Sequence, residues 1–341
     1  MSKDIIRIGF IGAGGIVKQR HFPGLRALPG IEFSAVCNSS RDSSDKVAAE
    51  YGIKVVLDDW RKLVELPDLD VVWIGTTPYM HADITLAALK AGKHVFCQAR
   101  MAMNLQEGMA MLAAAREHPD KITMLCPPPN AIKHGKYFAS LLKAGKIGRL
   151  ISFQLNSFGN AWADPMAPAH WRQKKELSGK NILSVGIYGE VLGRWFGQPH
   201  RLCAQGQVVF PRRGDLTVEI PDVVQVLGEW PGYLLGSMHW SGVYCDKPTD
   251  SLQLYGTDGV LSYDFGIDEI RLLQRGGNDV TPVVVPEEAT GAWNVEADFI
   301  YAVRNGGRPE PSFETGVNYM RFVEAVNVSM HSHQWVQLES I

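Results

Sequence analysis

The sequence predicts an α/β protein of two domains, a doubly wound parallel sheet followed by an α+β domain with a large, open, mostly antiparallel sheet. The chain has 341 residues, which is too long for one average core. Its first third alternates apolar, strand-like runs with helical patterns, as parallel sheets covered on both faces do. After about residue 126 the pattern becomes rich in strands with few helices. We therefore expect domains at 1–126 and 127–341.

A glycine-rich turn follows the first expected strand. Residues 5–11 form an apolar run, "GAGG" (12–15) interrupts it, and a helical pattern begins at Ile16. A strand, a glycine turn and a helix N-terminus together form an anion site, because backbone N–H groups and the helix dipole point at the ligand. Val17 stands at the third glycine position of GxGxxG, so the prediction depends on this context. We expect the phosphates of a dinucleotide to bind at Gly12, Gly14, Gly15 and Ile16.

The alternation continues along the first domain. Further strands are expected at 32–38, 54–57, 70–75, 94–97 and 122–126, and helices at 42–51, 60–65, 81–92 and from Asn104 onward. Ligands of such sheets bind at the carboxyl ends of the strands. We therefore assign the following residues to cofactor binding: Asn38, Ser39, Ser40, Arg41, Thr76, Thr77, Pro78, His81 and Gln98.

The end of the second strand bears on the choice of cofactor. A carboxylate there would accept from the ribose 2′-hydroxyl, but the sequence reads Asn-Ser-Ser-Arg (38–41). Arg41 could pair with a 2′-phosphate, so the sequence favours NADP(H) over NAD(H). The alternative is that Arg41 is a solvated residue at a helix start.

The second domain is expected to be mainly sheet. Strands are predicted at 150–158, 202–210, 223–229, 233–240, 252–255, 260–263 and 269–273, and helices at 132–144, 182–196, 295–304 and 315–331. The irregular stretch 163–171 is a candidate active-site loop. One open face of the sheet could pair with another subunit, and Trp230, Tyr233 and Trp240 are candidates for that contact.

Composition excludes several classes of partner. The net charge of −2 gives no basic field for nucleic acid or an anionic membrane. No apolar run reaches the length of a membrane span, and the first residues lack the shape of a signal peptide. Five scattered cysteines without a CxxC indicate buried thiols in a reducing cytoplasm. No metal-ligand spacing is found, so no metal is expected.

Four segments together resemble one family. They read "IGFIGAGGI", "DVVWIGTTPYMHADITLAALKAGKHVFC", "HWRQKKELSGKNILSVGIYGEVLGRWFG" and "FETGVNYMRFVEAVNVSMHSHQWVQL". In this order they resemble the Gfo/Idh/MocA family of glucose–fructose oxidoreductase and inositol dehydrogenase relatives. The resemblance implies a Rossmann domain, a substrate domain with an open sheet, a nicotinamide cofactor and a homodimer or homotetramer. It also implies a small sugar, polyol or cyclic diol as substrate.

The sequence departs from the family at its acid–base residues. The family usually reads Glu-Lys-Pro where this chain has Gln98, Ala99 and Arg100, so an alanine replaces the lysine that donates to the substrate oxygen. The family's Asp, Gly and His of a second signature are here Ser184, Gly186 and Tyr188. Loss of the lysine together with its carboxylate partner is consistent, because an isolated charge in a closed site is costly.

Other residues are therefore candidates for the proton chemistry. Tyr188 could donate to an alkoxide, with Arg100 as a cation that lowers its pKa. Arg100 could equally clamp a substrate carboxylate or lie in a surface salt bridge. Lys180 could replace the lost amine or be a solvated loop lysine. Candidate substrate-binding residues are His170, Trp171, Arg172 and Ser184, and the first three could also be structural anchors of their loop.

The leading hypothesis is an NAD(P)-dependent oxidoreductase that acts on a CH–OH group with a non-standard acid/base set. A second hypothesis is a redox-neutral lyase, hydrolase or epimerase with a resident cofactor, in which transient oxidation acidifies a neighbouring carbon. A third is a regulator that binds the cofactor and has lost catalysis, as the alanine at position 99 and the serine at position 184 allow.

Overall fold

The structure is a computed structural model that describes residues 5–277 and 279–341, and the chain divides into two compact units. The first unit combines the chain up to Pro127 with Asn294–Met320, and the second combines Pro128–Trp293 with Arg321–Ile341. The expected domain boundary at residue 126 lies next to Pro127, where the chain first passes from one unit to the other. Residues 294–320, which the sequence assigns to the second domain, instead belong to the first unit. The physical reason is that Phe299 packs edge-on against Trp73 and Phe96 of the first sheet.

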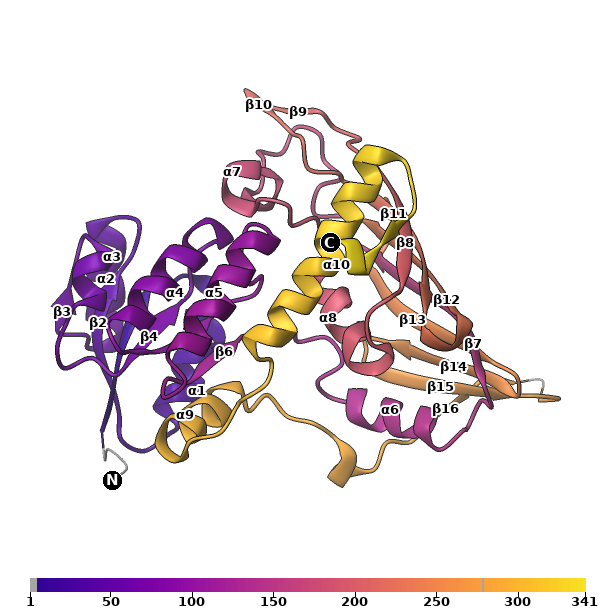
Figure 1. Cartoon of the computed structure of the whole chain (residues 1–341), viewed down its shortest axis with the longest axis horizontal. Helices are drawn as coiled ribbons and strands as arrows, with labels where there is room; N and C mark the ends of the chain where they lie inside the picture. The colour runs from indigo at the N-terminus through magenta and orange to yellow at the C-terminus, as the bar shows by residue number, and fades with distance from the viewer. Residues whose placement is uncertain (1–4, 278) are drawn as a thin grey trace. The chain divides into compact units, whose positions relative to one another are not determined.

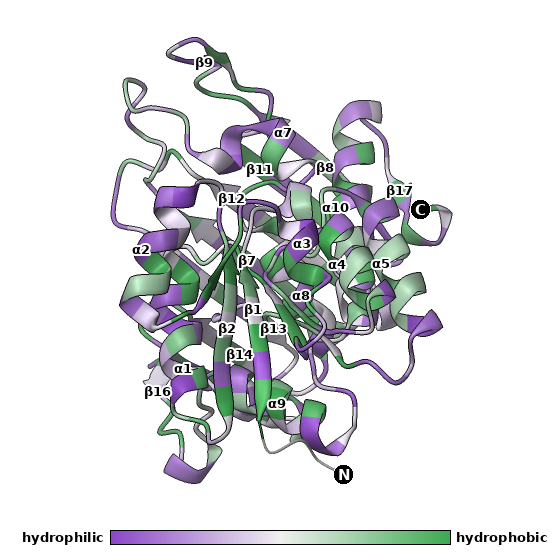
Figure 2. Cartoon of the chain, turned by 90° about the vertical axis from the view of Figure 1, so that its left-hand side faces the viewer, coloured by the Kyte–Doolittle hydropathy of each residue, from purple (hydrophilic) through white to green (hydrophobic). Residues whose placement is uncertain are grey.

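The sheet of the first unit is parallel, with six strands in the order β3-β2-β1-β4-β5-β6 in the described chain. The strands are β1 Ile6–Ile11, β2 Ile31–Cys37, β3 Val55–Val56, β4 Val71–Ile74, β5 His94–Cys97 and β6 Thr123–Leu125. Every residue of β4 is buried, as its continuous apolar run predicts. Figure 2 shows hydrophobic colour along β1 and β2 and mixed colour on the helices.

The helices of the first unit begin and end close to where the sequence predicts. They are η1 Val17–His21, α1 Phe22–Arg26, α2 Arg41–Tyr51, α3 Trp60–Val64, η2 Pro78–Met80, α4 His81–Lys90, α5 Leu105–Glu117, α9 Val295–Asn305 and the first part of α10 Phe313–Ser332. Asn104 caps α5 by accepting from the Glu107 N–H. Gly92 takes a left-handed φ of 75° after α4, as expected.

The second unit has a sheet of nine strands in the order β16-β15-β14-β13-β7-β12-β11-β8-β17 among the described residues. Its main strands are β7 Leu150–Phe158, β8 Arg201–Gln207, β11 Val223–Trp230, β12 Leu234–Ser241, β13 Thr249–Gly256, β14 Gly259–Asp264 and β15 Glu269–Gln274. Shorter strands are β9 Arg212–Arg213, β10 Leu216–Thr217, β16 Thr281–Pro282 and β17 Val336–Gln337. The β7–β12 pair is parallel and the other pairings are antiparallel, which confirms the mostly antiparallel sheet.

Helices cover one face of this sheet. Apolar residues of α6 Gly135–Lys143, α8 Val185–Phe196 and the second part of α10 join the inward residues of the strands in one core. Figure 1 shows these helices beside the strands of their own unit. The short helices are η3 Trp171–Gln173, α7 Lys175–Ser178, η4 Pro231–Tyr233, η5 Glu287–Ala289 and η6 Leu338–Ser340.

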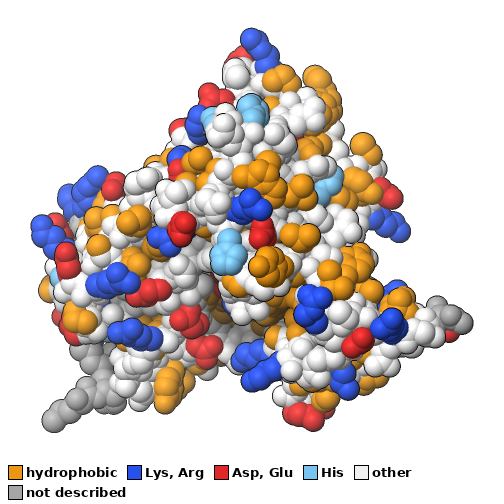
Figure 3. Space-filling view, turned by 45° about the vertical axis from the view of Figure 1, so that its right-hand side comes forward, with side chains coloured by type: hydrophobic (Ala, Val, Ile, Leu, Met, Phe, Trp, Pro, Cys, Tyr) orange, Lys and Arg blue, Asp and Glu red, His pale blue; other side chains and the backbone are white. Residues whose placement is uncertain are grey.

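The other face of the sheet carries exposed residues, but of the three aromatic residues we expected there, only Tyr233 is exposed. Trp230 and Trp240 are fully buried because strand alternation turns them toward the helices, so that part of the prediction is wrong. Tyr233 is exposed, and Leu227 and Leu235 are exposed on neighbouring strands. On the face shown in Figure 3, hydrophobic side chains lie in small groups between charged ones.

Three further expectations concern the whole chain. Cys37, Cys97 and Cys126 are buried as predicted, whereas Cys203 is half-buried and Cys245 is exposed. No helix in the part of the chain that the structure describes is long and apolar enough to cross a membrane. Within the same residues, no group of three or more His, Cys, Asp or Glu side chains is arranged to hold a metal ion.

Candidate active site

The glycine turn of the first unit leaves open space for a ligand. Gly12 has a φ of +83°, and a Cβ there would lie 2.7 Å from the backbone N of Thr76. In contrast, nothing lies within 4 Å of a Cβ built on Gly14 or Gly15. These two glycines line a hollow together with Lys18 and Lys46. Free space at a turn that precedes a helix, with two ammonium groups nearby, suits a phosphate.

The carboxyl end of β4 supports the same fit. Thr76 follows β4 and contacts the turn, and its Oγ1 atom is buried without a hydrogen-bond partner among the described residues. Thr77 begins the short helix η2, and Pro78 is buried in its first turn. Ile16, after the turn, is largely exposed. The residues present therefore fit a dinucleotide with its phosphates at the turn.

Asn38 fixes the turn and is not available to a ligand. Its Oδ1 accepts from the Ala13 N–H at 2.7 Å, and its Nδ2 donates to the carbonyl and hydroxyl oxygens of Ser43. Ser40 caps α2 by accepting from the Ser43 N–H. Both side chains thus tie the turn to the start of α2. Ser39 is exposed between them.

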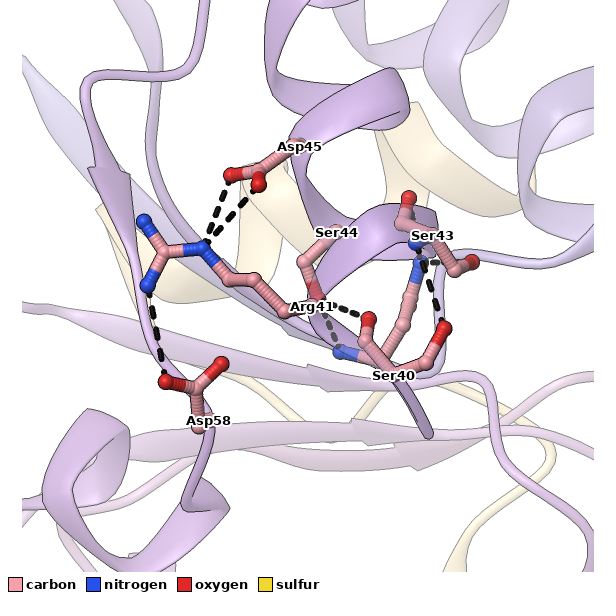
Figure 4. A network of polar contacts seen from close by, with 7 residues as sticks. Ser40, Arg41, Ser43, Ser44, Asp45 and Asp58 are labelled. Atoms are coloured by element: carbon pink, nitrogen blue, oxygen red, sulfur yellow. Dashed lines mark hydrogen bonds and ion pairs between the residues drawn. The ribbon is translucent and has the colours of Figure 1, made fainter.

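Arg41 is paired with two carboxylates, as Figure 4 shows. Its Nε donates to both oxygens of Asp45 at 2.9 and 3.1 Å, and an Nη donates to Asp58 at 3.4 Å. These partners, Asp45 first, raise the pKa of Arg41. Residues 38–41 carry no carboxylate, as the sequence shows, but Asp45 and Asp58 bring two carboxylates to Arg41. The i,i+4 spacing of Asp45 was a signal in the sequence, whereas Asp58 comes from the connection after β3 and could not be anticipated.

His81 joins the ends of two strands. It is fully buried, and its Nδ1 lies 2.9 Å from the Arg100 carbonyl oxygen while its Nε2 lies 3.0 Å from that of Thr76. Burial lowers the pKa of His81. Both ring nitrogens thus lie against backbone carbonyls, and His81 supports the ends of β4 and β5, while its assignment to cofactor binding stays a prediction.

A buried polar chain supports Gln98 at the end of β5. The Gln98 side-chain nitrogen contacts Nε2 of His21, and Nδ1 of His21 contacts Glu296 of α9. All three side chains are buried. A His Nδ1–H that donates to the carboxylate leaves Nε2 to accept from the Gln98 amide. The two residues far away in sequence therefore set the orientation of Gln98.

Arg100 follows in the same junction and is buried, with 7% of its surface exposed. Its carbonyl oxygen accepts from His81. The alternative of a solvated surface salt bridge for Arg100 therefore does not hold. Ala99, at the lysine position of the family, lies beside it and offers no side-chain polar group.

The second unit gathers polar side chains around Tyr188 of α8. Asn130 donates to the Tyr188 hydroxyl at 3.0 Å. Ser157 of β7 lies 3.0 Å from the hydroxyl of Ser184, which precedes α8. Asp250 of β13 interacts with both Ser157 and Tyr188, and its Oδ1 is buried without a hydrogen-bond partner in the described chain.

The electrostatics of this cluster differ from our expectation for Tyr188. Burial, and then the charge of Asp250, raise the pKa of Tyr188. Burial also raises the pKa of Asp250, although the hydroxyls of Ser157 and Tyr188 oppose this. Tyr188 is therefore a protonated donor beside a carboxyl group whose own pKa is raised, and among the described residues the groups that lower the pKa of Tyr188 are the neutral side chains of Ser157 and Asn130.

Ser157, Asp250 and Asn130 were missed in the sequence, although a signal existed for two of them. Asp250 is in phase with the buried Leu252 and Leu254, and Ser157 is in phase with the buried Phe153 and Leu155. Asp250 and Ser157 are also directly opposite each other in the β13–β7 pairing. A polar residue in the inward phase of a strand should have marked both.

Lys180 lies apart from this cluster. Its ammonium group is paired with Glu324 of α10, whose side chain is largely buried. Lys180 borders a groove of about 770 Å³ with Lys175 and Glu219, which form their own ion pair. The structure thus places Lys180 as a charge partner of α10 and does not bring it to Tyr188.

The loop before α7 is anchored at both ends. His170 caps the short helix 171–173, and the Arg172 guanidinium lies over the Trp171 ring at 4.4 Å. Burial lowers the pKa of Arg172, and burial with the charge of Arg172 lowers that of His170. Buried Arg213 donates to the carbonyls of Trp162, Asp164 and Ala167 and so holds the irregular stretch 163–171. This anchor could not be anticipated, because Arg213 is distant in sequence from the stretch that it holds.

Two family models match this chain. One, described as an oxidoreductase family with an NAD-binding Rossmann fold, Gfo/Idh/MocA, matches residues 6–125. The other, the GFO/IDH/MocA C-terminal domain, matches residues 136–262. Each match falls largely within one of the two units.

Several known proteins are similar to the chain. Levoglucosan dehydrogenase of Pseudarthrobacter phenanthrenivorans is 24% identical over 98% of this chain and 99% of its own. 1,5-Anhydro-D-fructose reductase of Ensifer adhaerens is 31% identical over 53% of this chain and 54% of its own. Trans-1,2-dihydrobenzene-1,2-diol dehydrogenase of Oryctolagus cuniculus is 29% identical over 73% of this chain and 72% of its own. The structure of a levoglucosan dehydrogenase with NADH superposes with a TM-score of 0.88 at 22% identity, over 98% of this chain and 99% of that one, which shows the same fold.

Proposed function

Because the chain belongs to the Gfo/Idh/MocA oxidoreductase family, we propose that it interconverts an alcohol and a carbonyl group on a sugar, polyol or cyclic diol with NAD or NADP. The cofactor supplies the acceptor or donor of the hydride. The glycine turn and Thr76 hold it, and Gln98 and Arg100 stand at the end of the next strand. The substrate is bound by the second unit, with Ser184, Trp171, Arg172 and His170 as the proposed contacts.

The observation that carries this proposal is the cluster of Ser157, Asp250 and Tyr188. Tyr188 and Ser184, which contacts Ser157, are two of the positions at which the family's acid–base signature is replaced here, and Asp250 restores a carboxylate from another element. In the oxidation direction, the substrate hydroxyl loses its proton to the Asp250 carboxylate, with Ser157 and Tyr188 as the neighbouring hydroxyls. In the reduction direction, protonated Asp250 returns that proton to the oxygen, while Tyr188 donates a hydrogen bond to it.

The raised pKa of Asp250 suits both directions. A carboxyl group that titrates closer to neutrality can accept and donate a proton at working pH, as a general acid–base residue must. Tyr188, whose pKa burial raises, stays protonated and donates a hydrogen bond to the developing charge. Lys180 has no part in this proposal, because its charge is paired with Glu324.

A substrate panel tests the proposal. Purified protein with NAD or NADP is assayed for reduced nicotinamide on levoglucosan, inositols, aldoses, L-sorbose and cyclic dihydrodiols. We expect turnover on at least one alcohol, abolished in D250N and retained in D246N, which changes an exposed Asp of the same unit. Binding of neither cofactor would contradict the proposal.

Redox-neutral chemistry is the second candidate, favoured by the alanine at position 99. In that case the cofactor would remain bound through purification, and product would form with no net change in reduced nicotinamide. Tight cofactor binding without any product would instead support a regulator.

We also propose a homo-oligomer formed through the outer face of the second sheet. Leu227, Leu235 and Tyr233 are exposed there. Light scattering of the wild type and of L227E/L235E tests this, and a wild-type monomer would contradict it.

A further inference from the structure

The chemistry at the end of β2 points to the cofactor that the first unit selects. We infer that the cluster of Arg41, Asp45 and Asp58 makes the glycine-turn site select NAD(H) over NADP(H). This inference rests on the proposed function and concerns the group next to the adenosine ribose. It replaces our sequence-based expectation of NADP(H), which depended on an unpaired Arg41.

The contacts of Arg41 engage two of the three nitrogens of its guanidinium with carboxylates. Nε donates to Asp45 one helical turn away, and an Nη donates to Asp58. Figure 4 shows both carboxylates on the guanidinium, beside the serines that start α2. A 2′-phosphate that displaced these two carboxylates would break their ion pairs with Arg41. A 2′-phosphate that bound beside them would be repelled by their negative charge.

Further carboxylates lie at this strand end beside Asp45 and Asp58. Asp42, in the first turn of α2, lines the hollow with Gly14 and Gly15. Asp58 and Asp59 lie close enough to the last residue of β2 that, after burial, their charges raise the pKa of the Cys37 thiol. Of these carboxylates, Asp45 and Asp58 pair with Arg41 and Asp59 pairs with Arg61, while Lys18 and Lys46 line the hollow.

An uncharged ribose 2′-hydroxyl meets no such penalty. The 2′-hydroxyl of NAD can donate to a carboxylate, whereas a phosphate carries up to two negative charges and cannot donate when ionised. The same carboxylates that repel NADP(H) can therefore accept from NAD(H). Exposed ion pairs contribute little to folding, so the pairs can be altered without loss of the fold.

The test is a fluorescence titration with NADH and with NADPH in the absence of substrate. We expect the wild type to bind NADH at least about tenfold more tightly, and this ratio to fall in added salt because the repulsion is screened. In D45N/D58N we expect NADPH affinity to rise by about tenfold or more, since Arg41 can then pair with the 2′-phosphate. Adding R41A to that variant should remove the gain.

D68N/D120N is the matched control. It removes the same number of charges from exposed positions at the amino ends of the strands, opposite the cofactor edge, and Asp120 also loses an ion pair, with Lys121. Its NADH to NADPH ratio should stay that of the wild type. A wild type that binds NADPH as tightly as NADH, or a ratio unchanged in D45N/D58N, would overturn the inference. A protein that binds neither dinucleotide would instead refute the proposed function, so the two failures are distinguishable.

Discussion

The glycine turn of the first unit and the Tyr188 cluster of the second unit are built in different ways. At the turn, consecutive residues between β1 and the next helix form the open site, and a single distant side chain, that of Asn38, fixes them. Around Tyr188, single side chains from a loop, two strands and a helix converge. The comparison shows why a cofactor site remains recognisable when its acid–base partner site has been replaced residue by residue.

The largest effect is expected from a substitution in the Tyr188 cluster. D250N should lower the rate of alcohol oxidation by about 100-fold or more, because the proton acceptor is lost. The fold should persist. Burial raises the pKa of Asp250 in the folded state, so the folded form binds this proton more tightly than the unfolded form, and the ionised group destabilises above that pKa.

Thermal unfolding tests whether ionised Asp250 destabilises the folded protein. The Tm of D250N relative to the wild type should be equal or higher at pH 8, and this difference should shrink as the pH falls toward the usual carboxyl range. A D250N protein that is less stable at pH 8 than D246N would contradict the linkage argument.

Removal of the Tyr188 hydroxyl should have the next largest effect. Y188F leaves Asn130 without an acceptor and takes a hydroxyl away from Asp250, so oxidation should slow by about tenfold or more. The Asp250 pKa should rise further, because a group that lowered it is gone. Y233F, at an exposed tyrosine of the same unit, should behave as the wild type.

The buried chain under Gln98 offers a smaller effect on the first unit. E296Q should weaken NADH binding several-fold and cost about 1–3 kcal/mol of stability, because His21 loses its charged partner. E314Q, at an exposed ion pair, is the control. The expected signature is a raised cofactor KM with little change in kcat. If kcat fell and the KM held, Glu296 would not position Gln98.

The smallest effect is expected at Lys180. K180M should leave turnover within about twofold of the wild type, since its charge is paired with Glu324 away from the Tyr188 cluster. A small drop in Tm should accompany it, because Glu324 is largely buried. A loss of turnover comparable to that of D250N would restore Lys180 as the replacement for the family lysine.

The fold was predictable from the sequence to a large extent. Strand 94–97 and strand 150–158 were placed with the observed ends, because apolar runs and alternation depend on local sequence. The return of residues 294–320 to the first unit was not predictable, because it depends on the packing of Phe299. Periodicity identifies an apolar helix face but does not specify which core it joins.

The site was predictable only in part. The turn residues and Thr76 could be assigned because strand ends in a parallel sheet share one edge. Two contacts could not be assigned, because each joins residues from separate elements. They are the pairing of Arg41 with Asp58 and the approach of Asp250 to Tyr188. The cross-strand position of Asp250 and Ser157 was the one available signal, and it required the strand register.

The pH dependence of kcat/KM for alcohol oxidation, compared between the wild type and D250N, tests the central claim most directly. The claim is that a carboxylate from β13 has replaced the family's lysine as proton acceptor. The wild-type rate should fall as the pH drops through the raised pKa of Asp250, because the protonated acid cannot accept, and D250N should lack this limb at its low residual rate. An unchanged limb and a near-normal rate in D250N would contradict the account.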